Sequence, residues 1–171
     1  MTWAAAGAQP YIGGPDGTDR WVKPWALGLY LRALADWLEV LDEFGLPDDA
    51  GARASYLAYA DWLLDEALTP LPPIASGDRA AFPYEWWLDG RAENDVPDVT
   101  SWLLLGADAL AYAHHLSGDD RYLEAAEALF RAGSHDPWFE GDLNTYSSTK
   151  ETANAVTWGN TFLWEWAAAG G

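Results

Sequence analysis

The segment from Val99 to Gly133 limits the choice of fold more than any other part of the chain. In its first half, apolar residues recur at three- and four-residue intervals along two rows, which is the spacing of a helix. That half has Asp108 as its one carboxylate, and a helix that is apolar nearly all round is buried on most sides. Gly118 predicts the end of this helix, and the second half carries Arg121 and Glu124 on one face only. We therefore expect an inner helix paired with an outer helix.

The amino-acid composition limits which partners the chain is expected to bind and in which cellular compartment it is expected. The 171 residues suffice for a single domain with a core, spanning residues 1–171, and 27 acids against 9 bases give a net charge of -18. Such a charge repels nucleic acid and anionic membranes, so we expect neither as a partner. The chain has no cysteine, no long apolar run that predicts a membrane span and no evident secretory signal. If the chain is complete, these features predict a cytoplasmic protein.

The same reading along the whole chain predicts an all-α fold. Short turns join the first helix to the second and the third to the fourth, so antiparallel hairpins in two layers are expected, with odd helices inner and even helices outer. Longer segments, 1–23, 69–98 and 134–147, precede the odd helices and are therefore expected on one face. The fifth helix has no outer partner, which leaves Phe162 and Trp166 as an uncovered flank. The five predicted helices are Pro24–Phe44, Asp49–Leu68, Val99–Gly118, Asp119–Gly133 and one that begins near Ser148 and continues through Trp164.

One stretch of the chain resembles a known architecture. AYAHHLSGDDRYLEAAEALF (111–130) is similar to a hairpin that recurs in the (α/α) toroid of carbohydrate-active enzymes. These families include six-hairpin glycosidases and the toroid domains of polysaccharide lyases, among them the C-terminal toroid of rhamnogalacturonan exolyase-like proteins. The resemblance implies a partial toroid, because a full toroid has more helices than the five predicted here. It also implies completion by the rest of the toroid or by a second copy of the chain.

The resemblance implies a glycan or oligosaccharide as the ligand, bound on the face that carries the long segments. Glycoside hydrolysis needs two carboxylates that flank the sugar bond. Glu85 stands beside indoles and Asp142 follows a glycine, so these two are the candidate catalytic carboxylates, with Tyr146 as a third catalytic candidate. Twelve tryptophans are far above the usual share; most are expected to pack between helices, and some to stack on sugar rings. The candidate substrate-binding residues are Tyr84, Trp86, Trp87, Arg91, His135 and Trp138.

Two alternatives remain open from the sequence. A polysaccharide lyase needs a base at the sugar C5 and a group that neutralises the uronate, and Tyr84, Tyr146, His135, Arg91 and Lys150 offer those chemistries. The rival class is a non-catalytic helical-hairpin scaffold or protein-binding module, in which tryptophan serves packing alone.

No cofactor or metal is expected, although two acidic pairs are candidate Ca²⁺ ligands: Asp16 with Asp19, and Asp95 with Asp98. Other polar residues are assigned to structure. Asp108 is expected to be a satisfied buried carboxylate, and His114 and His115 are expected to pack at the end of their helix.

Overall fold

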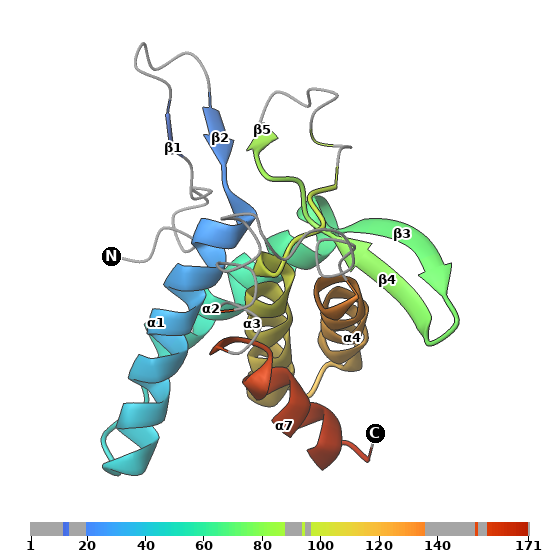
Figure 1. The fold of residues 1–171 in the computed structure, drawn as a ribbon. Coiled ribbons are helices and arrows are strands. Elements are labelled where there is room, and N and C mark those ends of the chain that lie inside the picture. The colour runs from blue at the N-terminus through green and yellow to red at the C-terminus, as the bar shows by residue number, and fades with distance from the viewer. Residues whose placement is uncertain are drawn as a thin grey trace.

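The fold is mostly helical, with two small antiparallel sheets (Figure 1). The computed structural model describes residues 12–13, 20–87, 94, 97–135, 153 and 157–170. The strands are β1 (Ile12–Gly13), β2 (Arg20–Val22), β3 (Thr69–Ile74), β4 (Gly77–Ala81) and β5 (Trp86–Trp87). The helices are α1 (Pro24–Glu43), α2 (Ala50–Trp62) with its π-helical extension η2 (Leu63–Ala67), α3 (Trp102–Ser117), α4 (Asp120–Ser134) and α7 (Asn160–Ala168).

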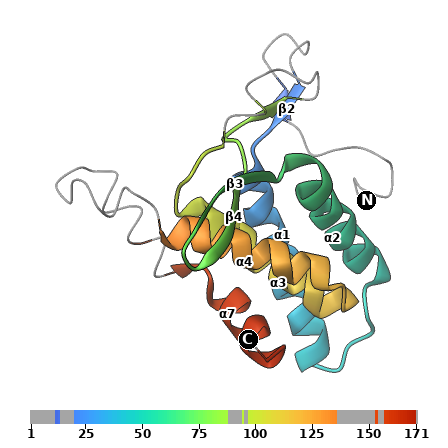
Figure 2. The ribbon, with the colours of Figure 1, turned by 90° about the vertical axis from the view of Figure 1, so that its right-hand side faces the viewer.

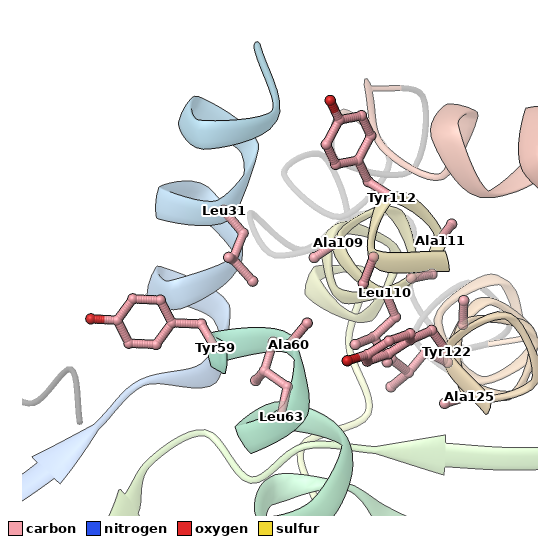
Figure 3. Close-up of a cluster of buried hydrophobic side chains, with 14 of the residues drawn as sticks. Leu31, Tyr59, Ala60, Leu63, Ala109, Leu110, Ala111, Tyr112, Tyr122 and Ala125 are labelled. Carbon is pink, nitrogen blue, oxygen red and sulfur yellow. The ribbon is translucent and has the colours of Figure 1, made fainter. Parts of the chain in front are cut away.

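Helix α3 is the centre of the fold. It packs against α1, α2, α4 and α7, and every residue from 103 to 113 is buried. Figure 3 shows α1 and α2 on one side of α3, and α4 on the other. Leu105 and Leu110 are buried on α3, whereas Glu124 on α4 and Asp61 on α2 are exposed. The difference between a deeply buried α3 and a half-exposed α4 agrees with the hydrophobic pattern of the two helices. Val156, in the predicted fifth helix, lies outside the described residues.

Short side chains and tyrosine hydroxyls fix how closely the helices approach α3. A Cβ placed on Gly28 of α1 would lie 3.0 Å from Leu105, so this glycine permits the contact between α1 and α3. From α2, the Tyr56 hydroxyl donates a hydrogen bond to the Ala109 carbonyl at 2.9 Å inside the core. A buried hydroxyl needs such a partner, and here the bond links two helices that are far apart in sequence.

The segment 69–98 is not the long irregular connection that the sequence predicts, because it contains a β-hairpin. Strands β3 and β4 form an antiparallel hairpin that pairs Thr69 with Ala81 and turns at residues 75–76, just before Gly77, whose φ is 130°. The prolines of β3 are compatible with an edge strand, where a missing N–H is tolerated, and β4 packs against α4 (Figure 2). The all-α class is therefore a coarse description, because two small sheets accompany the helices.

The last helix also differs from the prediction. Gly159 has a φ of 93°, so the predicted continuous helix from Ser148 is interrupted and α7 begins only at Asn160. The predicted flank is wrong at Phe162, which is 2% exposed and packs on Phe130. At Trp166, which is 36% exposed, the prediction is confirmed, and Trp164 on the same helix is 76% exposed. Among the described residues, no helix combines the length and apolar character needed to cross a bilayer.

Asp108 is a satisfied buried carboxylate, as predicted, and it holds the start of α7. It accepts backbone N–H groups from Gly159 at 2.8 Å and from Phe162 at 3.0 Å. Further along α7, Glu165 lies 3.1 Å from the imidazole of His115 at the end of α3. The two carboxylates thus join α7 to the middle of α3 and to its C-terminal end.

Candidate functional site

The candidate site lies at the end of the molecule where α1 begins. Strand β2, which leads into α1, pairs with β5 from the segment before α3, in a register that places Trp21 opposite Trp87 and Val22 opposite Trp86. Two segments about 65 residues apart in the sequence are thereby joined beside the start of α1 (Figure 1). Their side chains are therefore available to one surface.

Lys23 is the central residue of this surface. Its Nζ donates a hydrogen bond to the Tyr84 hydroxyl at 3.3 Å and lies 3.4 Å from a Glu85 carboxylate oxygen. The same Nζ lies 4.4 Å from the ring centroid of Tyr84, 5.2 Å from that of Trp21 and 5.8 Å from that of Trp25. These are cation–π distances. We define the Lys23 cluster as Trp21, Lys23, Trp25, Tyr84, Glu85 and Trp87.

The charge on Lys23 is stabilised by its neighbours. Burial by itself lowers the pKa of the ammonium, but the hydrogen bonds with Tyr84 and Glu85 and the charge of Glu85 outweigh burial and raise the pKa above its ordinary value. Glu85 does not meet the condition expected for a general acid, an enclosed carboxyl with apolar neighbours, because a cation faces it and a third of its side chain is exposed. The pair presents one fixed positive and one fixed negative group.

A row of tilted rings in contact with one another extends from the cluster toward the helices. Tyr84 and Trp25 have centroids 6.3 Å apart, Trp25 and Trp102 are 4.9 Å apart, and Trp102 and Trp158 are 4.7 Å apart. The indole N–H of Trp25 is buried and has no hydrogen-bond partner among the described residues. Aromatic rings of this number, placed together at the end of a helical layer, form a rigid apolar floor with a few polar groups at its edge.

The two tryptophans of β5 have different surroundings. Trp87 contacts Trp21, with centroids 6.1 Å apart, and its backbone forms two hydrogen bonds with the side chain of Asn94. Trp86 packs edge-on against Trp62 of α2 at 5.4 Å and adjoins the hydrophobic core. Trp86 therefore contributes to packing, and its assignment as a sugar platform stays a prediction.

The rings of the cluster differ in exposure. Tyr84 is 48% exposed, whereas Trp21, Trp25 and Trp87 are half-buried. A nearby hollow, which Trp25 and Trp102 line in part, measures only about 10 Å³. A hollow of that size holds at most about one water molecule, so it is too small for a sugar ring.

The remaining predicted residues divide between the described and the undescribed parts of the chain. His135 is exposed at the end of α4, beside the start of α3 in the same hairpin. Asp98 donates its backbone N–H to the carbonyl of Phe82, and the described residues hold no group of three metal-ligating side chains. The other predicted site residues and Ca²⁺ candidates lie outside the described residues: Asp16, Asp19, Arg91, Asp95, Trp138, Asp142, Tyr146 and Lys150.

Sequence reasoning missed Lys23, Trp21 and Trp25 as members of the site. A signal was present in the sequence, because one of only two lysines in the chain stands in the run WVKPW, between two tryptophans. The spacing was informative once Pro24 was taken as the start of a helix, since residues just before a helix start share its end of the molecule.

A second hollow, of about 110 Å³, opens between α1 and α3, and Tyr56 of α2 and Thr161 of α7 also line it. Arg32, Glu39, Asp108 and Tyr112 line it, but each has a structural partner or an exposed position: Arg32 pairs with Asp36, and Asp108 holds α7. Burial raises the pKa of Tyr112 to about 12, which keeps its hydroxyl neutral in ordinary buffers. We assign this hollow to packing between helices.

Comparison of the chain with protein-family models, with curated proteins and with solved structures found no match.

Proposed function

We propose that the chain is part of a carbohydrate-active enzyme, a glycoside hydrolase or a polysaccharide lyase, and that the Lys23 cluster binds its glycan. The observation that carries the proposal is the ammonium of Lys23, fixed among three aromatic rings and beside Glu85 at an exposed surface. Ring faces suit the C–H faces of a sugar, and the charged pair suits its hydroxyl groups. A uronate carboxylate would also be attracted by Lys23.

The proposed architecture is a partial (α/α) toroid. Its support is the arrangement of α1, α3 and α7 along one side of the molecule, with α2 and α4 in the two grooves behind them. A further support is that apolar side chains stay exposed on α1 and α7, at the two ends of this row: Leu29, Trp37, Val40, Phe44, Leu163 and Trp164. Exposed apolar edges are expected where further helices, or a second copy, complete a ring.

The proposed function is tested by affinity electrophoresis against a panel of soluble neutral and uronate polysaccharides. We expect at least one polysaccharide to retard the protein, and Tyr84→Ala to lose most of the retardation without a change in melting temperature, because this side chain is half exposed. Trp164→Ala is the matched control, since it removes an exposed aromatic group from α7. Equal retardation of both variants, or none of the wild-type protein, contradicts the proposal.

Hydrolase and lyase activities are distinguished by their products. Hydrolysis of a retained polysaccharide releases reducing ends alone, whereas elimination also creates an unsaturated uronate with its own ultraviolet absorbance. Glu85→Gln is expected to lower either activity, because Glu85 is the one predicted catalytic carboxylate that lies in the cluster.

A protein-binding role is the second candidate function. One observation favours it, the exposed apolar face of α1, which lies outside the Lys23 cluster.

A further inference from the structure

A stripe of apolar side chains on α1 is turned away from α3. We call these residues the α1 stripe: Leu29, Tyr30, Ala33, Trp37, Val40 and Phe44. Trp37 is 47% exposed and Phe44 is 68% exposed, although Leu31 and Leu38 on the opposite face of the same helix are buried. Figure 1 shows α1 at the margin of the helices, with α3, α4 and α7 all to one side. A concentrated apolar face on an exposed helix marks an interaction surface.

The spacing of the stripe fits another helix. Leu29, Ala33, Trp37, Val40 and Phe44 follow one another at intervals of four, four, three and four residues. Such a row forms a continuous ridge of about 22 Å, and a ridge of this kind packs into the groove of a second helix. An amphipathic helix with apolar residues at matching intervals is therefore the complementary shape.

Acidic residues border the stripe on both sides. Along one side lie Asp36, Glu39 and Glu43; Asp36 pairs with Arg32 at 2.9 Å, whereas the other two have no ion-pair partner among the described residues. On the other side, the indole N–H of Trp37 donates to Asp49 at 3.4 Å. A helix that lies on the stripe would therefore place its flanking side chains next to carboxylates.

We propose that the α1 stripe docks an amphipathic helix of a partner protein, with lysine or arginine on both borders of its apolar face. Charge complementarity selects this occupant over a second copy of the chain. In an antiparallel pair of α1 helices the same borders meet, so the three acids Asp36, Glu39 and Glu43 would face their copies with Arg32 as the one cation of that border, and each chain has a net charge of -18. The inference concerns a surface separate from the Lys23 cluster and gives the protein-binding role a defined partner chemistry.

The test uses a fluorescent helical peptide of leucine and lysine, about 18 residues long, so that it spans the stripe. Fluorescence anisotropy in about 0.15 M salt is expected to show saturable binding to the whole chain. The variant Val40→Ser with Phe44→Ser is expected to weaken binding about tenfold or more, since exposed apolar contacts are removed. Leu163→Ser with Trp164→Ser is the matched control on α7 and is expected to bind as the wild-type protein does.

The charge part of the proposal has its own variants. Glu39→Gln with Glu43→Gln is expected to weaken binding several-fold and to reduce its dependence on salt, because two of the bordering carboxylates are lost. Equal affinity of the α1-stripe variant and the wild-type protein overturns the proposal, since binding would then be non-specific attraction to an acidic chain. Equal binding of a leucine–glutamate peptide also overturns it. A dimer in sedimentation that Val40→Ser with Phe44→Ser dissolves would assign the stripe to a second copy instead.

Discussion

The carboxylate of Asp108, buried on α3, accepts the backbone N–H of Phe162 at the start of α7 at 3.0 Å. The Gly159 N–H reaches the other oxygen of the same carboxylate at 2.8 Å. The first N–H groups of a helix lack partners within that helix, so a side chain from a different helix supplies the cap here. One buried side chain of α3 therefore caps the start of α7.

Replacement of this carboxylate should release α7. Asp108→Ala leaves two N–H groups without their acceptor, and we expect it to lower the free energy of unfolding by about 3 kcal/mol. Limited proteolysis should then cut near α7 before the rest of the chain unfolds. Asp36→Ala, which removes an exposed carboxylate from α1, should have little effect on either measurement. Equal resistance of Asp108→Ala and the wild-type protein would contradict the capping role.

The pH dependence of stability should report the burial of Asp108. Burial raises its pKa above the ordinary value of 3.8, against the hydrogen bonds from Phe162 and Gly159, which lower it. The folded state then holds this proton more firmly than the unfolded state, so stability falls as pH rises from 3.8 through the raised folded pKa. In urea titrations, the stability deficit of Asp108→Asn relative to wild type should thus be smaller at neutral pH than near pH 3.8. A deficit that grows toward neutral pH would mean that folding lowers the pKa of Asp108 instead of raising it.

A glycine on α3 is required for the contact with the β3–β4 hairpin. A Cβ on Gly106 would lie 2.6 Å from a ring carbon of Phe82, so Gly106→Ala should destabilise the fold by about 1–3 kcal/mol. Gly51→Ala on the exposed side of α2 is the control, and it should stabilise by up to about 1 kcal/mol through helix propensity. Denaturant unfolding measures both, and a neutral Gly106→Ala would show that the hairpin yields at this contact.

A hydrogen bond between side chains links the outer helices. The buried Tyr122 of α4 donates its hydroxyl proton to the carboxylate of Asp61 on α2. Tyr122→Phe is expected to lower the free energy of unfolding by about 1 kcal/mol, because one hydrogen bond is lost while the ring packing stays. Tyr30→Phe on the exposed face of α1 should be neutral. If the two variants have the same stability, the contact contributes nothing measurable.

Helix periodicity predicted the described helices well where the pattern was long. The ends of α3 and α4 were predicted within a few residues, because Gly118, with φ 70°, and the capping residue Asp119 both leave local signals. The β3–β4 hairpin was missed because its prolines indicate an irregular segment, and its packing on α4 is a tertiary contact that leaves no local signal. The break at Gly159 was also missed, since the acceptor that favours it is Asp108, distant in the sequence.

The candidate site, like the fold, could be predicted from the sequence only in part. The run of Tyr84, Glu85, Trp86 and Trp87 was visible as a cluster of aromatic and acidic residues. Its partner Lys23 was not, because the pairing of β2 with β5 joins two-residue and three-residue stretches that carry no periodic signal of their own. Trp86 and Trp87 are neighbours in sequence but point to opposite faces of β5, which is why one adjoins the core and the other contacts Trp21.

Glycan binding at the Lys23 cluster is tested most directly by the response of the indole N–H resonances to added sugar. In a ¹⁵N-labelled sample with the tryptophan signals assigned by single substitutions, neutral and uronate oligosaccharides are titrated one at a time. We expect at least one oligosaccharide to shift the signals of Trp21, Trp25 and Trp87 while those of Trp37 and Trp164 stay unchanged. Tyr84→Ala should weaken this response. Shifts confined to Trp37 or Trp164, or no shift with any oligosaccharide, would contradict glycan binding at the Lys23 cluster.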